Sequence, residues 1–219
     1  MRDSSIYHPC LDEHGRRLRL AAPSTECNLA LLADPQASLT FVPGSRCAGV
    51  LNGVALADCP PAEIEQALAC AQAQPHPIQE PPYRLPPGRQ AAAGAVVAEP
   101  DGRIWLVAPS NAFGGYQATF PKGRVADGIS LQATAIKEVW EESGLRVRLT
   151  GFLGDFGRTQ TWTRFYLAER VGGHPGAMGW ESQAVHLATP AEARRLLNRA
   201  TDQAVLDALA ALGGPARRG

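Results

Sequence analysis

One stretch of the chain decides its fold: GRVADGISLQATAIKEVWEESGL, residues 123–145. Its second half predicts a helix that begins at the N-cap residue Ser130 and ends before Gly144, a residue type that commonly closes helices. Three carboxylates of this helix fall within an arc of about 100°, those of Glu138, Glu141 and Glu142. The opposite arc is apolar, with Ala133, Ile136, Val139 and Trp140. We therefore expect the helix to pack one face and to present three acids on the other.

The three glutamates predict a cation site. Like charges within one helical turn repel, and a hard divalent ion such as Mg²⁺ or Mn²⁺ suits clustered carboxylate oxygens. Upstream, Lys122, Gly123 and Arg124 form a tight loop that offers two cations and backbone N–H groups to a phosphate. This pattern favours cleavage of a phosphoanhydride. A solvated acidic face on a surface helix would show the same periodicity, and that alternative stays open.

The same stretch resembles the Nudix box. The pattern of that family is Gly, five residues, Glu, seven residues, Arg-Glu, an apolar residue, any residue, Glu-Glu, any residue, Gly and an apolar residue. Seven of the nine specified positions match, and they are Gly123, Glu138, Val139, Glu141, Glu142, Gly144 and Leu145. Ile129 and Lys137 stand where the pattern has Glu and Arg. The resemblance extends over roughly residues 89–213.

The resemblance implies a metal-dependent hydrolase that acts on a nucleoside diphosphate linked to another group. It makes Glu138, Glu141 and Glu142 metal ligands for Mg²⁺ or Mn²⁺, one of them activating water, and the carbonyl of Gly123 a further ligand. Family members often add an acidic residue from a later loop, and Glu181 is our candidate for this ligand or base. A surface role for Glu181 is the alternative.

The substrate-binding residues follow from position and charge. The resemblance makes Lys122 and Arg124 phosphate contacts, and Arg158 and Arg164 at neighbouring strand ends could extend the cationic trap or lie solvated at the surface. Aromatic side chains that could stack on a base or simply pack are Trp162, Tyr166 and Trp180. Dinucleoside polyphosphates and ADP-ribose-like compounds are the expected substrates, both small molecules.

The two departures from the box are coupled. In the family the Glu and Arg at these positions usually pair, and losing both partners together costs less than stranding one buried charge. The ammonium of Lys137 can reach water or Glu141, four residues on. We therefore predict a rearranged, active site. The alternative function is a Nudix-fold module that senses a metabolite without turnover and signals through the N-terminal residues, and Ile129 and Lys137 favour it.

The remaining pattern predicts an α+β fold, the Nudix-type α/β/α sandwich of the resemblance. Strands are expected over 90–99 and 103–108 around the turn Pro100-Asp101-Gly102, then over 116–120, 145–156, 161–171 and 183–188, and helices over 190–198 and 201–212. Residues 121–124 are expected to form a loop. Residues 172–179 are glycine-rich and are expected to form a flexible connection or a lid.

The chain is expected to divide into an accessory α+β domain at 1–74, a proline-rich linker at 75–88 and the Nudix domain at 89–213. The first part has expected strands over 38–42 and 48–57 and a helix over 61–72. Packing, dimerisation, substrate shaping and binding of another protein are its candidate roles, so a homodimer is one expected assembly.

Charge and cysteine content narrow the function classes. The 219 residues have no formal net charge, but residues 1–88 hold six basic and nine acidic residues and residues 89–219 hold fifteen and twelve. We expect no nucleic-acid partner, no membrane segment and a cytoplasmic location. The five cysteines have no C-x-x-C spacing and are expected to be buried thiols; a metal set of His8, Cys10, His14 and Cys27 is the alternative.

Overall fold

A mixed sheet of seven strands forms the centre of the computed structural model, which describes residues 5–46, 48–58, 60, 62–63, 65–66, 68–69 and 78–213. The strand order is β3-β11-β7-β6-β10-β9, with β8 paired to β6. These strands are β3 (Leu39–Phe41), β6 (Gln90–Ala98), β7 (Ile104–Pro109), β8 (Lys122–Arg124), β9 (Leu145–Gly157), β10 (Thr161–Gly173) and β11 (Ser182–Ala188).

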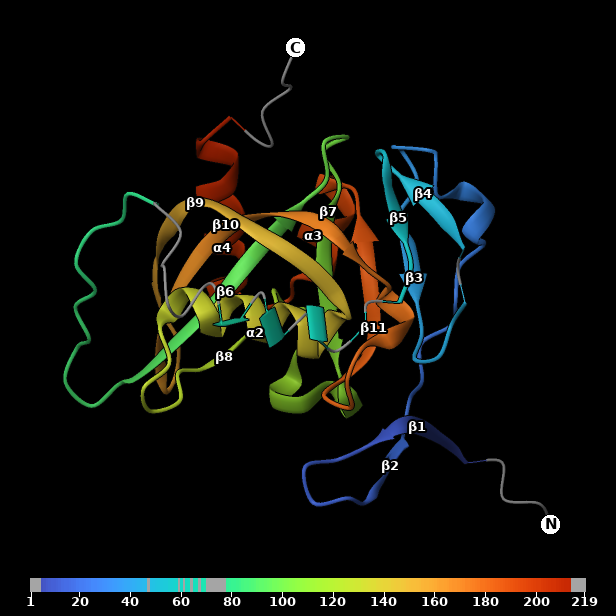
Figure 1. Ribbon diagram of the computed structural model, residues 1–219, viewed down its shortest axis with the longest axis horizontal. Coiled ribbons are helices and arrows are strands. Elements are labelled where there is room, and N and C mark those ends of the chain that lie inside the picture. Colours follow the sequence, from blue (N-terminus) through green and yellow to red (C-terminus); the bar gives the residue numbers. More distant parts are fainter. Residues whose placement is uncertain are drawn as a thin grey trace.

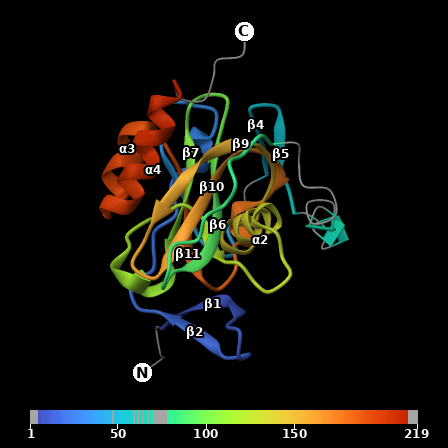
Figure 2. The ribbon, with the colours of Figure 1, turned by 90° about the vertical axis from the view of Figure 1, so that its left-hand side faces the viewer.

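Helices cover both faces of the sheet. Helix α2 (Leu131–Ser143) lies on one face, and α3 (Pro190–Leu196) and α4 (Ala200–Ala211) lie on the other (Figure 1 and Figure 2). One apolar cluster joins α2 to the sheet and a second joins α3 and α4 to it. The α+β class and the three-layered sandwich are therefore confirmed. No described helix is long and apolar enough to cross a membrane.

The ends of α2 lie where the sequence places them. The side chain of Ser130 accepts a hydrogen bond from the backbone N–H of Ala133 at 3.1 Å, which caps the first turn. Gly144 ends the helix with a φ of 68°, in the left-handed region that favours glycine. The local sequence thus fixes the length of the helix that carries the three glutamates.

Strand β8 sits where β6 and β7 separate. β7 pairs with β6 only through Trp105 and Ile104, and further along β6 the residues Ala92–Gly94 pair with β8. A Cβ atom at Gly94 would lie 3.0 Å from the Cα of Lys122, so a glycine permits this close approach. The expected loop at 121–124 is therefore partly a strand. The strand expected over 116–120 is wrong, because β8 takes this edge of β6 and only Thr119 makes an isolated bridge.

The N-terminal residues form two hairpins and one strand of the main sheet. β1 (Ile6–Leu11) pairs with β2 (Arg17–Leu20), and β4 (Gly49–Leu51) pairs with β5 (Val54–Leu56). The single strand expected over 48–57 is wrong, because Asn52 and Gly53 both have positive φ and turn the chain. Of the helix expected over 61–72, residues 62–63, 65–66 and 68–69 are helical and the rest lies outside the described residues.

The N-terminal strands share a core with the later ones. β3 pairs with β11, and Phe41, Leu51 and Leu56 belong to the same apolar cluster as Trp105 and Tyr166. Segment 39–56 therefore packs directly against the sheet. The division into 1–74, 75–88 and 89–213 stays a prediction, and a separate accessory domain is not confirmed.

Two buried arginines tie the N-terminal segment to the sheet. Arg170 pairs with Glu99 at 2.6 Å and donates to the carbonyl of Leu51 at 2.8 Å. Arg103 pairs with Asp101 at 2.7 Å and donates to the carbonyl of Leu32 at 2.8 Å. Each guanidinium therefore satisfies a carboxylate and a backbone oxygen in the interior, where an unpaired charge would be costly.

We predict that Arg170→Met lowers the free energy of unfolding by about 3–5 kcal/mol, because it strands the buried carboxylate of Glu99. Urea denaturation followed by circular dichroism measures this. The matched control is Arg148→Met, which breaks the exposed pair with Glu169 and should cost no more than about 1 kcal/mol. Equal losses in the two variants would contradict the structural role of Arg170.

The contribution of His186 to stability should fall in mild acid, because burial lowers the pKa of His186 to about 4 from an ordinary value of 6.5. Glu192 and Arg195 are the charged groups nearby, and Nδ1 of His186 lies 3.0 Å from Oγ1 of Thr40. The unfolded chain takes up the proton first, so the stability that depends on His186 decreases as pH falls from about 6.5 towards 4, by an amount on the order of 3 kcal/mol. The difference in free energy of unfolding between the unaltered chain and His186→Gln should change by this amount over that pH range; a constant difference would contradict it.

Candidate active site

Helix α2 buries two of its three glutamates. Glu138 and Glu142 lie one turn apart and are each 9% exposed, whereas the side chain of Glu141 is 51% exposed. Burial, opposed by Lys137 and reinforced by the charge of Glu141, raises the pKa of Glu138 to about 7. Burial likewise raises the pKa of Glu142 to about 8, against the attraction of Lys122. A solvated acidic face, the open alternative, does not describe these two side chains.

Strand β8 lies directly against the two buried carboxylates. The backbone N–H of Lys122 donates to Oε2 of Glu142 at 3.2 Å. Gly123 follows, and a Cβ atom there would collide with both carboxylate oxygens of Glu138. The first glycine of the predicted motif is therefore required for space: it lets the strand approach the helix and its acids.

The two cations of this strand differ in their surroundings. The ammonium of Lys122 lies 5.4 Å from the ring centroid of Tyr116, and burial lowers the pKa of this lysine while the charge of Glu142 opposes that shift. Lys122 is therefore a cation beside the carboxylates, as the sequence predicts. Arg124 is exposed and donates to the side-chain oxygen of Gln160 at 3.0 Å, so it lies at the rim.

The loop after β10 is fixed to the end of α2. The backbone N–H of His174 donates to the carbonyl of Gly144 at 3.0 Å, and that of Gly179 donates to the carbonyl of Glu141 at 2.7 Å. The expectation of a lid or flexible connection over 172–179 is therefore wrong. The same loop carries Glu181, an exposed residue whose pKa is raised by partial loss of solvent and then by the charge of Glu141.

The hairpin formed by β1 and β2 also acts on Glu181, and no motif in the sequence predicts it. Glu13, in the turn between β1 and β2, also raises the pKa of Glu181. Asn111 holds the hairpin, since its side chain donates to the carbonyl of Arg19 at 2.9 Å and accepts from the N–H of Ala21 at 2.7 Å. Residues far apart in the sequence thus meet beside Glu181.

The other predicted arginines already have acidic partners. Arg158 pairs with Asp202 at 2.5 Å, and Arg164 pairs with Asp155 at 2.7 Å and with Glu80 at 3.0 Å. Both guanidinium side chains are less than a tenth exposed. Both are engaged within the protein, and their contact with phosphate stays a prediction.

The three aromatic candidates differ in how far they are buried. Tyr166 is fully buried, and its hydroxyl donates to Glu80 at 2.8 Å, so it packs and cannot stack on a base. Trp162 and Trp180 are partly exposed. Trp180 lies between Gly179 and Glu181 in the chain, and its carbonyl accepts from the hydroxyl of Ser110 at 2.7 Å.

Lys137 occupies the acidic face. Its ammonium forms an ion pair with Glu141, as predicted, and lies 3.8 Å from Oε1 of Glu138. Partial burial would lower the pKa of Lys137, but the hydrogen bond and charge of Glu141 raise it. The side chain that replaces the arginine of the motif therefore bridges two of the three glutamates.

Within the described part of the chain, no three His, Cys, Asp or Glu side chains form a group that could hold a metal ion as they stand. His8, Cys10, His14 and Cys27, the alternative set, are thus not grouped in the structure. Cys10 and Cys27 are exposed, contrary to the expectation of buried thiols, because they lie on the surface of the N-terminal segment. Cys47, Cys59 and Cys70 lie outside the described residues.

Comparison with curated proteins finds RNA pyrophosphohydrolases from two strains of Caulobacter vibrioides. Each is 33% identical over 99 residues, a match that covers 44% of this chain and 54% of the relative. The chain thus spans about half the length of the curated relatives it matches.

Solved structures share the fold. A NUDIX hydrolase from Nitrosomonas europaea has a TM-score of 0.50 at 16% identity, covering 57% of this chain and 91% of that one. A C. elegans Ap4A hydrolase has a TM-score of 0.47 at 19% identity, covering 56% and 96%.

A family model described as the NUDIX domain matches residues 88–209. The matched range contains α2 with its three glutamates, strand β8 and the loop that carries Glu181. Because this range is more than half of the chain, the chain belongs to the NUDIX domain family.

Proposed function

We propose that this chain hydrolyses a phosphoanhydride bond in a nucleoside diphosphate derivative with the help of Mg²⁺ or Mn²⁺. The observation that carries the proposal is the pair of buried carboxylates, Glu138 and Glu142, against which Lys122 and Gly123 are packed. Buried like charges are costly unless cations accompany them. A site built this way is suited to bind a divalent ion together with a polyphosphate.

The residues fit a hard divalent ion. Carboxylate oxygens are the donors that Mg²⁺ and Mn²⁺ prefer, and Gly123 leaves space beside Glu138 where any larger residue would place a Cβ atom. Glu138, Glu141 and Glu142 would hold the ion, with the carbonyl of Gly123 and the carboxylate of Glu181 as further candidates. A bound ion supplies polarisation of a phosphoryl oxygen and activation of water.

The chain's own cations would bind the phosphates. Lys122 is partly buried beside Glu142, where its charge is less screened than at the surface and attracts phosphate oxygens more strongly. Arg124 lies exposed at the rim, where its guanidinium can bind a second phosphate. We place the enzyme in the cytoplasm, as a monomer or homodimer.

Two substrate classes follow. Dinucleoside polyphosphates and ADP-ribose-like compounds form the first class, small molecules whose phosphates Lys122 and Arg124 would bind. The 5′ end of an RNA is the second candidate, favoured by the 33% identical RNA pyrophosphohydrolases of Caulobacter vibrioides. That candidate would overturn the expectation of no nucleic-acid partner.

We predict product release from at least one of a diadenosine polyphosphate, ADP-ribose and a 5′-triphosphorylated RNA, with Mg²⁺ or Mn²⁺. Glu142→Gln should lower kcat/KM at least about 100-fold, the scale expected for loss of a charge-stabilising group. Glu169→Gln, at an exposed pair on the sheet edge, is the control and should leave the rate unchanged. Thermal stabilisation by a substrate without turnover would favour the sensor, and no response to any compound would contradict both functions.

The close approach of β8 to α2 gives a second test. Gly123→Ala should displace the carboxylate of Glu138, costing about 1–3 kcal/mol of stability and at least about tenfold in kcat/KM. Gly151→Ala is the matched control, because a Cβ there would meet only Leu167, at an ordinary 3.5 Å. Equal rates for the two variants would show that the contact with Gly123 does not position Glu138.

A further inference from the structure

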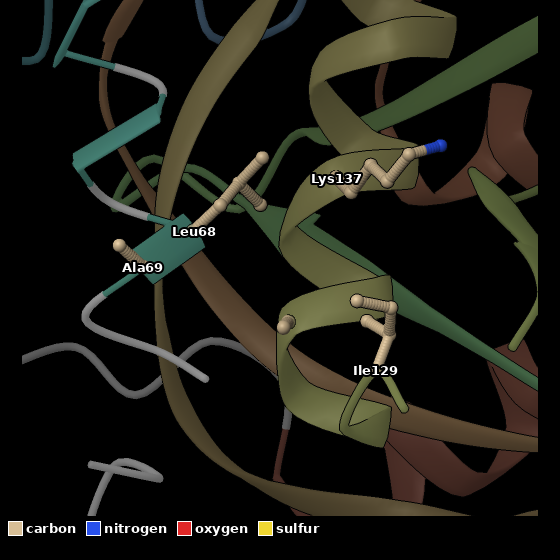
Figure 3. A pocket seen from close by; sticks show the side chains of 5 residues that line it. Leu68, Ala69, Ile129 and Lys137 are labelled. Atoms are coloured by element: carbon tan, nitrogen blue, oxygen red, sulfur yellow. The ribbon is translucent and has the colours of Figure 1, made fainter. Parts of the chain in front are cut away.

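The side chain of Lys137 lies between two unlike environments. Its stem lines a pocket of about 240 Å³ together with Leu68, Ala69, Ile129 and Ala133 (Figure 3). Its ammonium points away from Ile129 and Leu68 (Figure 3), to the ion pair with Glu141 and to within 3.8 Å of Glu138. The lysine thus contacts the apolar pocket with its stem and the glutamates with its ammonium.

The apolar pocket explains this orientation. The labelled side chains Leu68, Ala69 and Ile129 offer no acceptor to an ammonium, and bringing a charge among them would be costly (Figure 3). Ile129 stands where the family pattern has a glutamate, so the usual acidic partner is missing. The nearest acidic partners are then the glutamates of α2 itself.

Resting on the proposed function, we propose that Lys137 is a tethered cation that competes with the divalent ion for Glu138 and Glu141. Its ammonium pairs with Glu141 and lies close to Glu138, two of the carboxylates that would ligate the metal, and its positive charge repels a divalent ion beside them. Lys137 is therefore a positioning residue that sets metal affinity.

The expected size of the effect follows from exposure. The side chains of Lys137 and Glu141 are 44% and 51% exposed, so their pair is a surface pair of modest strength, and the half-buried approach to Glu138 adds to it. We expect removal of the ammonium to lower the Kd for Mn²⁺ about three- to tenfold. A larger change would require a deeper burial than this lysine has.

The test is Mn²⁺ binding to the full chain, measured by the electron paramagnetic resonance signal of free Mn²⁺ in the absence of substrate. Lys137→Met keeps the stem over the pocket and removes the charge, and it should bind Mn²⁺ about three- to tenfold more tightly than the unaltered chain. Arg195→Met is the control, because it removes the cation of an exposed pair with Glu192 on α3 and should leave the Kd unchanged.

A second variant separates competition from simple charge. Ile129→Glu offers Lys137 another carboxylate at the pocket. In the chain that keeps Lys137, this change should lower the Kd for Mn²⁺. In the Lys137→Met background, it should lower the Kd by a smaller factor. Equal effects of Ile129→Glu in both backgrounds would contradict the competition, as would an unchanged or higher Kd in Lys137→Met. Failure of every variant to bind Mn²⁺ would instead contradict the metal site of the proposed function.

Discussion

Two carboxylates buried one turn apart on α2, those of Glu138 and Glu142, are the constraint around which the site is arranged. Burial and, after it, the charges of neighbouring glutamates raise their pKa values, so ionising both is costly unless a cation accompanies them. β8 supplies a backbone N–H to Glu142 and, through Gly123, the space beside Glu138. Lys122 and Lys137 supply cations, but neither lysine pairs with both buried carboxylates. A divalent ion could therefore bind between them.

The opposite charges of the two halves of the chain have an internal explanation. Arg170 and Arg103 of the later half bind backbone carbonyls of the earlier one. Arg164 pairs with Glu80, and Arg146 pairs with Glu63, so acidic residues before position 89 meet arginines after it. The positive charge of the later half therefore serves folding as well as the candidate phosphate site.

Local signals predicted the parts of the molecule that depend on a few neighbouring residues. The cap at Ser130, the stop at Gly144 and the spacing of the glutamates placed α2 and its acidic face correctly. The Asn52-Gly53 dipeptide is also a local signal, since both residues favour the positive φ that they adopt in the turn between β4 and β5.

Long-range pairing could not be read from the sequence. Arginine at 158 and 164 has the same local pattern whether it meets a phosphate or a buried aspartate, and only the fold brings Asp202 and Glu80 to them. The same holds for β3, a three-residue strand that joins the main sheet through β11, and for the fixing of residues 174–179 to the end of α2. The pocket beside Ile129 is lined by Leu68 and Ala69, about sixty residues earlier in the chain. The apolar surroundings of Ile129 therefore become apparent only in the folded structure.

We expect the acidic face of α2 to hold a divalent ion once Lys137 leaves it. Anomalous diffraction from crystals of the full chain grown with Mn²⁺ would locate that ion. The expected result is an anomalous peak beside the carboxylates of Glu138 and Glu142, next to Gly123, with the ammonium of Lys137 no longer paired with Glu141. Well-ordered carboxylates without such a peak at saturating Mn²⁺, or a peak with the pair of Lys137 and Glu141 intact, would contradict it.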